Sequence, residues 1–199
     1  MWLIPCIARY LVTANEWSSF VNVAYHFLET IKVPRSVSVY LFIDSWSHLK
    51  TKDEVRRQFS VPDVHINTSQ VLLVEGDFAR AFKKSSSEFD AVVTLFFIDT
   101  ARNLMNYFDT ISQVLKPGGV WINFGPLLYG TSPWVQLSLE EIIQVAEAMG
   151  FEFLETDDAC GHVTLPGHHV RGKEAWYNFN SSSLNQFAYY AQFWVARKR

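Results

Sequence analysis

The sequence predicts an α/β fold with a mostly parallel sheet, and the stretch from Phe89 to Leu128 carries the observations behind that prediction. Asp90–Phe97 is an uninterrupted apolar run of strand length, and Val120–Phe124 is a second one. Between them, Thr100–Leu115 repeats apolar residues at the spacing of an amphipathic helix. Two apolar strands joined by a helix indicate a βαβ unit in a sheet that is covered on both faces.

The residues that end this unit's elements mark the place to look for chemistry. Lys116-Pro117-Gly118-Gly119 is expected to stop the helix, because proline cannot continue a helix and glycine adopts the left-handed conformation common at helix ends. Ligands of parallel sheets bind beyond the carboxyl ends of the strands, where Asp99 follows a very apolar run. An acid there could equally cap the N-terminus of the next helix, and both interpretations stay open.

Further elements are expected on both sides of the unit. Ser18 is predicted to cap a helix that reaches Thr30, and Ser138 with Glu141 forms a capping-box pattern for a later helix. Asp157–Ser183 is polar and is predicted to be a long loop. Short strands are expected at Tyr10–Ala14, Gln70–Val74, Phe151–Thr156 and Phe187–Ala196. The last two follow a helix and predict an antiparallel pair at one edge of the sheet.

Composition narrows the class of protein. Hydrophobic residues make up 49% of the chain and charged residues 19%, which favours one globular domain over residues 1–199. A net charge of −3 gives no basic face, so nucleic acid is not expected as a partner. The apolar start is broken at Arg9 and is too short to span a bilayer, so no membrane partner is expected either. We interpret this apolar N-terminal segment as the interior of a domain whose beginning is missing. Two cysteines without a metal pattern favour a cytoplasmic protein.

Three acids each follow a predicted strand and stand beside an aromatic residue: Glu16, Asp77 and Asp99. Carboxyl ends of parallel strands share one edge of a sheet, so these side chains are expected together. Acids placed in this way suit the hydroxyls of a ribose and the amino group of an adenine. The phosphate-binding pattern G-x-G-x-x-G is absent, so S-adenosylmethionine, which has no phosphates, fits better than a dinucleotide.

Other polar residues carry weaker signals. His168 and His169 are adjacent and lack a third ligand at metal spacing, so no metal site is expected. His26 lies among aromatic residues on a predicted helix and is expected to be a core residue. Tyr189 and Tyr190 alternate across the last strand, so one of them faces inward, for sheet packing or for a site.

Five motifs, in this order, resemble the carnosine N-methyltransferase (N2227-like) family. They are NEWS at 15–18, GDF at 76–78, FFIDT at 96–100, LKPGG at 115–119 and WINFGPLLY at 121–129. The similarity runs from about Ala8 to the C-terminus. KPGG alone occurs widely in methyltransferases, whereas FFIDTA followed by KPGG and WINFGPLLY is specific.

The resemblance implies a Rossmann-like class I methyltransferase fold with an antiparallel C-terminal edge, truncated at its N-terminus so that the glycine-rich turn after the first strand is missing. It implies S-adenosylmethionine as cofactor and methyl transfer to the imidazole of carnosine or a related histidine-containing peptide. Carried over by position, Glu16 would bind the ribose, Asp77 and Phe78 the adenine, Leu95 the cofactor pocket, Asp99 the imidazole, and Tyr189 the substrate.

One departure from the family leaves alternatives open. The family usually has a histidine after PLLY, where this chain has Gly130, and a histidine at 162, 168 or 169 could stand in. The alternatives are a truncated, inactive methyltransferase-like protein, or a methyltransferase for another acceptor such as a protein histidine. A homodimer and a nuclear pool beside the cytoplasmic one are compatible with each reading.

Overall fold

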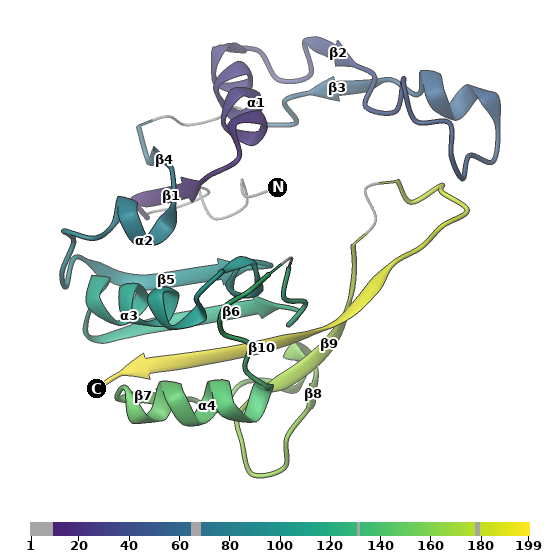
Figure 1. Ribbon diagram of the computed structural model, residues 1–199. Coiled ribbons are helices and arrows are strands. Elements are labelled where there is room, and N and C mark those ends of the chain that lie inside the picture. Colours follow the sequence, from purple (N-terminus) through teal and green to yellow (C-terminus); the bar gives the residue numbers. More distant parts are fainter. Residues whose placement is uncertain (1–9, 65–68, 131, 178–179) are drawn as a thin grey trace. The chain divides into compact units, whose positions relative to one another are not determined.

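The computed structural model describes residues 10–64, 69–130, 132–177 and 180–199 (Figure 1). The chain divides into two compact units. The first holds the described residues up to Ala81 and residues 180–186; the second holds residues 82–177 and 187–199. Segments far apart in the sequence therefore share each unit. The single domain expected over residues 1–199 stays a prediction.

The first unit is built around a parallel pair of strands. β1 (Val12–Glu16) pairs with β4 (Val71–Glu75), so that Glu16 lies opposite Glu75. Helix α1 (Ser19–Thr30) begins after Ser18, whose hydroxyl accepts a hydrogen bond from the Val21 N–H, as the sequence predicted. The remaining elements are the antiparallel strands β2 (Val37–Val39) and β3 (Phe59–Val61), a 3₁₀ turn (Lys52–Arg56) and the short helix α2 (Phe78–Ala81).

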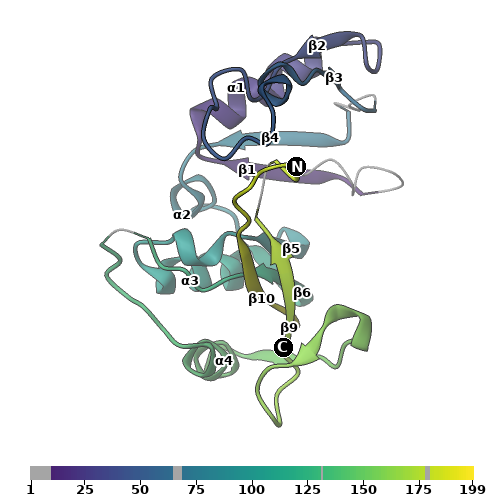
Figure 2. The ribbon, with the colours of Figure 1, turned by 90° about the vertical axis from the view of Figure 1, so that its right-hand side faces the viewer.

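The second unit is a six-stranded mixed sheet in the order β5-β6-β10-β9-β8, with β7 also paired to β10 (Figure 1; Figure 2 shows β5, β6, β10 and β9 from another side). Its strands are β5 (Phe89–Leu95), β6 (Leu115–Gly125), β7 (Phe151–Phe153), β8 (His162–Val163), β9 (Arg171–Trp176) and β10 (Ala188–Lys198). Its helices are α3 (Leu104–Val114) and α4 (Leu139–Ala148). β5 and β6 are parallel, and the other pairs are antiparallel. The α/β class and the antiparallel C-terminal strands are confirmed, although antiparallel pairing extends further than expected.

Large side chains form the core of the second unit. The indoles of Trp121 and Trp194 are fully buried and meet edge to face with centroids 5.2 Å apart. The buried Trp121 Nε1 donates to the Thr94 hydroxyl at 2.9 Å, and that hydroxyl donates to the Asn123 amide oxygen at 2.8 Å. These bonds satisfy polar atoms that would otherwise be costly to bury.

No helix of the described chain is long and apolar enough to cross a membrane.

Four local expectations are corrected. Helix α3 begins at Leu104 and not at Thr100. Lys116–Gly119 ends the helix as predicted but then forms part of β6, as a bulge against β5. Residues 157–183 contain strands β8 and β9 where a loop was expected. His26 is half exposed between Glu29 and Glu75, at 2.9 Å from each carboxylate, and is not a core residue.

Candidate functional site

Asp99 lies in a 3₁₀ turn, Ile98–Thr100, between β5 and α3, and only 6% of its surface is exposed. Its Oδ2 accepts a hydrogen bond from the Leu128 backbone N–H at 2.9 Å. Helix α3 has a cap of its own, because Asn103 Oδ1 accepts from the Met105 N–H at 3.1 Å. Asp99 is therefore not the cap of α3, and its buried carboxylate is directed to the neighbouring pocket.

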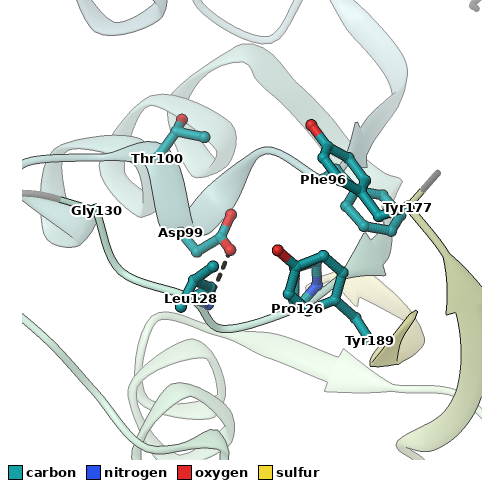
Figure 3. Close-up of a pocket in the computed structure, with 8 residues that line it drawn as sticks. All are labelled: Phe96, Asp99, Thr100, Pro126, Leu128, Gly130, Tyr177 and Tyr189. Carbon is teal, nitrogen blue, oxygen red and sulfur yellow. Dashed lines mark hydrogen bonds between the residues drawn. The ribbon is translucent and has the colours of Figure 1, made fainter. Parts of the chain in front are cut away.

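The pocket beside Asp99 has a volume of about 320 Å³ and lies within the second unit (Figure 3). Three aromatic rings form one wall. Phe96 stacks on Tyr177 with centroids 5.3 Å apart, and Tyr189 meets both rings edge-on at 6.0 and 5.6 Å. The hydroxyl of Tyr189 points toward Asp99. The full lining is Phe96, Asp99, Thr100, Pro126, Leu128, Gly130, Tyr177 and Tyr189.

The backbone at Phe96 sets the direction of its ring. Phe96 has φ of +50°, a left-handed conformation that non-glycine residues adopt at a cost of roughly 1–3 kcal/mol. Its N–H donates to the Phe124 carbonyl at 2.8 Å, beside Gly125. A Cβ at Gly125 would lie 2.9 Å from the Phe96 nitrogen, so only glycine lets the two strand ends approach this closely. The close approach at Gly125 turns the chain out of β5 and brings Phe96 into the wall of the pocket.

Burial dominates the electrostatics of Asp99. Desolvation raises the pKa of its carboxyl group, and the Leu128 N–H opposes that rise. Burial also raises the pKa of Tyr129, with the charges of Asp99 and Glu141 adding to the effect. A ligand that offers an N–H or a positive charge to Asp99 would replace the lost hydration. The pocket thus suits a flat ring with a donor at its edge.

Two of the three strand-end acids lie at one edge of the parallel strand pair in the first unit. The Gly76 N–H donates to the Glu16 carbonyl at 3.0 Å, so Glu16 and Asp77 lie at the same ends of β1 and β4, as predicted. Glu16 Oε1 accepts from the Ser18 N–H at 2.7 Å, and Asp77 Oδ1 from the Arg80 N–H at 3.0 Å. The other oxygen of each carboxylate has no hydrogen bond from the described residues.

The remaining predicted site residues divide between the units. Phe78 is buried at the start of α2 in the first unit. Leu95 ends β5 in the second unit, in register with Phe124. Asp99 and Tyr189 line the same pocket, and their roles toward a substrate stay predictions.

Sequence reasoning missed part of the pocket wall. Phe96 stands in the FFIDT motif, but the motif predicts no role for it. Tyr177 carries no local signal, because its place depends on the long-range pairing of β9 with β10. None of the described histidines is among the residues that line the pocket, and a histidine in place of the one missing at Gly130 stays a prediction. The described residues also contain no group of three side chains that could hold a metal ion.

Comparisons with known proteins agree with the motifs. A family model described as carnosine N-methyltransferase matches residues 2–199. The carnosine N-methyltransferase of Schizosaccharomyces pombe is 33% identical over 92% of this chain and 51% of its own length. That of Rattus norvegicus is 31% identical over 99% of this chain and 48% of its own. The chain thus spans about half the length of these curated relatives.

Among solved structures, a candidate methyltransferase from Bacillus halodurans matches 65% of this chain and 72% of its own, with 14% identity and a TM-score of 0.46. Family membership rests on the sequence comparisons, since the family model covers nearly the whole chain. The chain belongs to the carnosine N-methyltransferase family.

Proposed function

We propose that this chain provides the acceptor site of an S-adenosylmethionine-dependent N-methyltransferase that acts on the imidazole of carnosine or a related histidine-containing peptide. One observation carries the proposal. Asp99 is buried beside a pocket walled by aromatic rings, with one oxygen held by the Leu128 N–H. Relatives that are named carnosine N-methyltransferases support the choice of acceptor.

Asp99 would select which ring nitrogen reacts. The pKa of free imidazole is about 6.5, so the neutral ring is common at pH 7 and carries one N–H and one lone pair. A hydrogen bond from the ring N–H to Asp99 fixes the tautomer. The other nitrogen then keeps its lone pair and faces away from Asp99.

The same carboxylate would stabilise the charge that the reaction creates. Methylation turns a neutral imidazole into a cation, and a negative charge held in a poorly hydrated pocket favours that change. The faces of Phe96, Tyr177 and Tyr189 favour a cationic ring for the same reason, through their quadrupoles. Since little acid–base work is needed, in-line placement of the reacting atoms supplies most of the rate.

The two strand-end acids of the first unit would hold the cofactor. When bound, S-adenosylmethionine supplies a methyl group on a positively charged sulfur. Glu16 and Asp77 fit such a ligand, because one oxygen of each carboxylate takes no hydrogen bond from the described residues and could accept from a hydroxyl or an amino group. Glu16 would accept from the ribose, and Asp77 and Phe78 would hold the adenine.

The test is a methyl-transfer assay with labelled S-adenosylmethionine and carnosine. We expect one methyl group on a ring nitrogen, identified by NMR of the product. Anserine, in which a ring nitrogen of the same dipeptide is already methylated, is the control and should accept no label at that nitrogen. Transfer to histidine-containing proteins but not to carnosine would assign the pocket to another acceptor. Binding of neither carnosine nor S-adenosylmethionine in calorimetry would overturn the proposal.

A further inference from the structure

We propose that Tyr129 is a positioning residue, whose hydroxyl ties the loop beside the pocket to the start of α4 and thereby holds the Leu128 N–H on Asp99. The loop, here called the site loop, comprises residues 126–130 and 132–137. The link to methyl transfer rests on the function proposed above, whereas the link between Tyr129 and Asp99 does not.

The tie consists of two hydrogen bonds to one residue. Tyr129 Oη donates to the Leu137 carbonyl at 2.6 Å and accepts from the Leu137 N–H at 3.2 Å. Leu137 directly precedes Ser138, the N-cap of α4. Ser138 and Glu141 form a complete capping box, with the Glu141 carboxylate 2.7 Å from the Ser138 nitrogen. Tyr129 is thus anchored on a backbone position that the adjacent capping box holds in place.

A second tether holds the far half of the site loop. The Trp134 N–H donates to the Arg102 carbonyl at 2.6 Å, and an isolated parallel bridge joins Asn103 to Val135. Arg102 and Asn103 follow the turn that carries Asp99 after a single residue, Ala101. The near half of the loop, residues 126–130, follows the end of β6 at Gly125, contains the tie at Tyr129 and lines the pocket through Pro126, Leu128 and Gly130.

This arrangement gives Tyr129 a specific effect on Asp99. Leu128 and Tyr129 are neighbours in sequence, so the place of the Tyr129 ring restricts the Leu128 N–H. The Leu128 N–H stabilises the ionised carboxylate of Asp99 and so opposes the rise in its pKa that burial causes. Among the described residues, Tyr177 and Tyr189 are the other titratable groups that line the pocket, and the charges of Asp99 and Glu141 both act on Tyr129. The negative charge of Asp99 also raises the pKa of Tyr129, which keeps its phenol protonated and able to donate.

The test is Tyr129→Phe, which keeps the ring and removes the hydroxyl. The pKa of Asp99 is measured by ¹³C NMR of the labelled carboxyl group, with Asp99→Asn to assign the signal. We expect Tyr129→Phe to raise that pKa by about 0.5–1 unit, because the Leu128 hydrogen bond weakens. In turnover, the acid limb of kcat should move up by the same amount, with the affinity for S-adenosylmethionine unchanged.

Ser138→Ala is the comparison variant, because it weakens the capping box beside Leu137 but leaves the Tyr129 hydroxyl in place, so the pKa of Asp99 should rise less than in Tyr129→Phe. An equal rise of the Asp99 pKa in Ser138→Ala would mean general loosening and would overturn the proposal, as would an unchanged pKa in Tyr129→Phe. Amide exchange in the unmutated chain provides a check that needs no variant. The Leu128 and Leu137 amides should open together, and fast exchange at Leu137 with Leu128 still protected would contradict the tie. Absence of methyl transfer by the unmutated chain would affect the proposed function alone.

Discussion

An acid at a strand end can cap the next helix or serve a binding site, and the surroundings of Asp99 distinguish these two roles. Its burial, its bond to Leu128 and the separate cap at Asn103 favour a role in the pocket. We therefore expect Asp99→Asn to lower kcat with carnosine by roughly 10²-fold or more, since one group aimed at developing charge is removed. Calorimetry should give an unchanged affinity for S-adenosylmethionine. Equal losses in turnover and in cofactor affinity would mean that Asp99 only supports the fold.

Although Asp99→Asn should lower kcat, it should raise the stability of the folded chain at neutral pH. Burial raises the pKa of Asp99 in the folded chain above that in the unfolded chain, so the folded state binds more protons. Folding is favoured below the unfolded pKa, and that advantage is lost as pH rises through the folded pKa. The asparagine side chain of the Asp99→Asn variant carries no charge, and its amide oxygen can still accept from the Leu128 N–H.

Thermal melts of Asp99→Asn and the unmutated chain measure this difference. At pH 7 the variant should melt about 1–3 °C higher, and the difference should disappear as pH falls through the pKa of Asp99. A variant that melts lower at every pH would show that the carboxylate makes structural contacts that an amide cannot replace.

At the scale of single elements, residues that act on near neighbours were predictable. The capping box at Ser138 and Glu141, the cap at Ser18 and the end of α3 at Lys116–Gly119 follow from sequence spacing, and all three are confirmed. Strands β8 and β9 were not predictable in this way. The sequence of β9 is RGKEAW, which lacks apolar alternation, and it is a strand because it pairs with β10. Tyr177 reaches the pocket only through that pairing.

The start of α3 offers a test at the same scale. Asn103→Ala removes the side-chain oxygen that accepts from the Met105 N–H, and an N-cap loss of this kind costs about 1 kcal/mol. We expect lower stability in denaturant unfolding, with kcat changed far less than in Asp99→Asn. Asn103→Asp keeps an accepting oxygen and should restore stability. Full stability in Asn103→Ala would show that the hydrogen bond from Met105 to Asn103 does not stabilise the start of α3.

At the scale of the whole molecule, the chain returns to its first unit after building most of the second. Residues 180–186 belong to the first unit although they lie between β9 and β10 in sequence. Arg57 holds this return segment, because its guanidinium donates to Asn180 Oδ1 at 2.7 Å and to the Ser182 hydroxyl at 3.1 Å. The same group lies over the rings of Phe42 and Phe59, at 4.9 and 5.1 Å from their centroids. Local sequence spacing gave no signal for these bonds, which link residues more than 120 positions apart.

Arg57→Ala should therefore loosen one unit and leave the other intact. Loss of two hydrogen bonds from a charged, partly buried donor should lower the local opening free energy by about 1–3 kcal/mol. Hydrogen exchange followed by mass spectrometry should show faster exchange in β2, β3 and residues 180–186, and unchanged exchange in β6 and β10. Arg57→Lys keeps the charge but loses the planar fork, so an intermediate effect is expected. If β6 and β10 exchange faster to the same degree, the two units unfold together, and Arg57 stabilises the whole chain through its return segment.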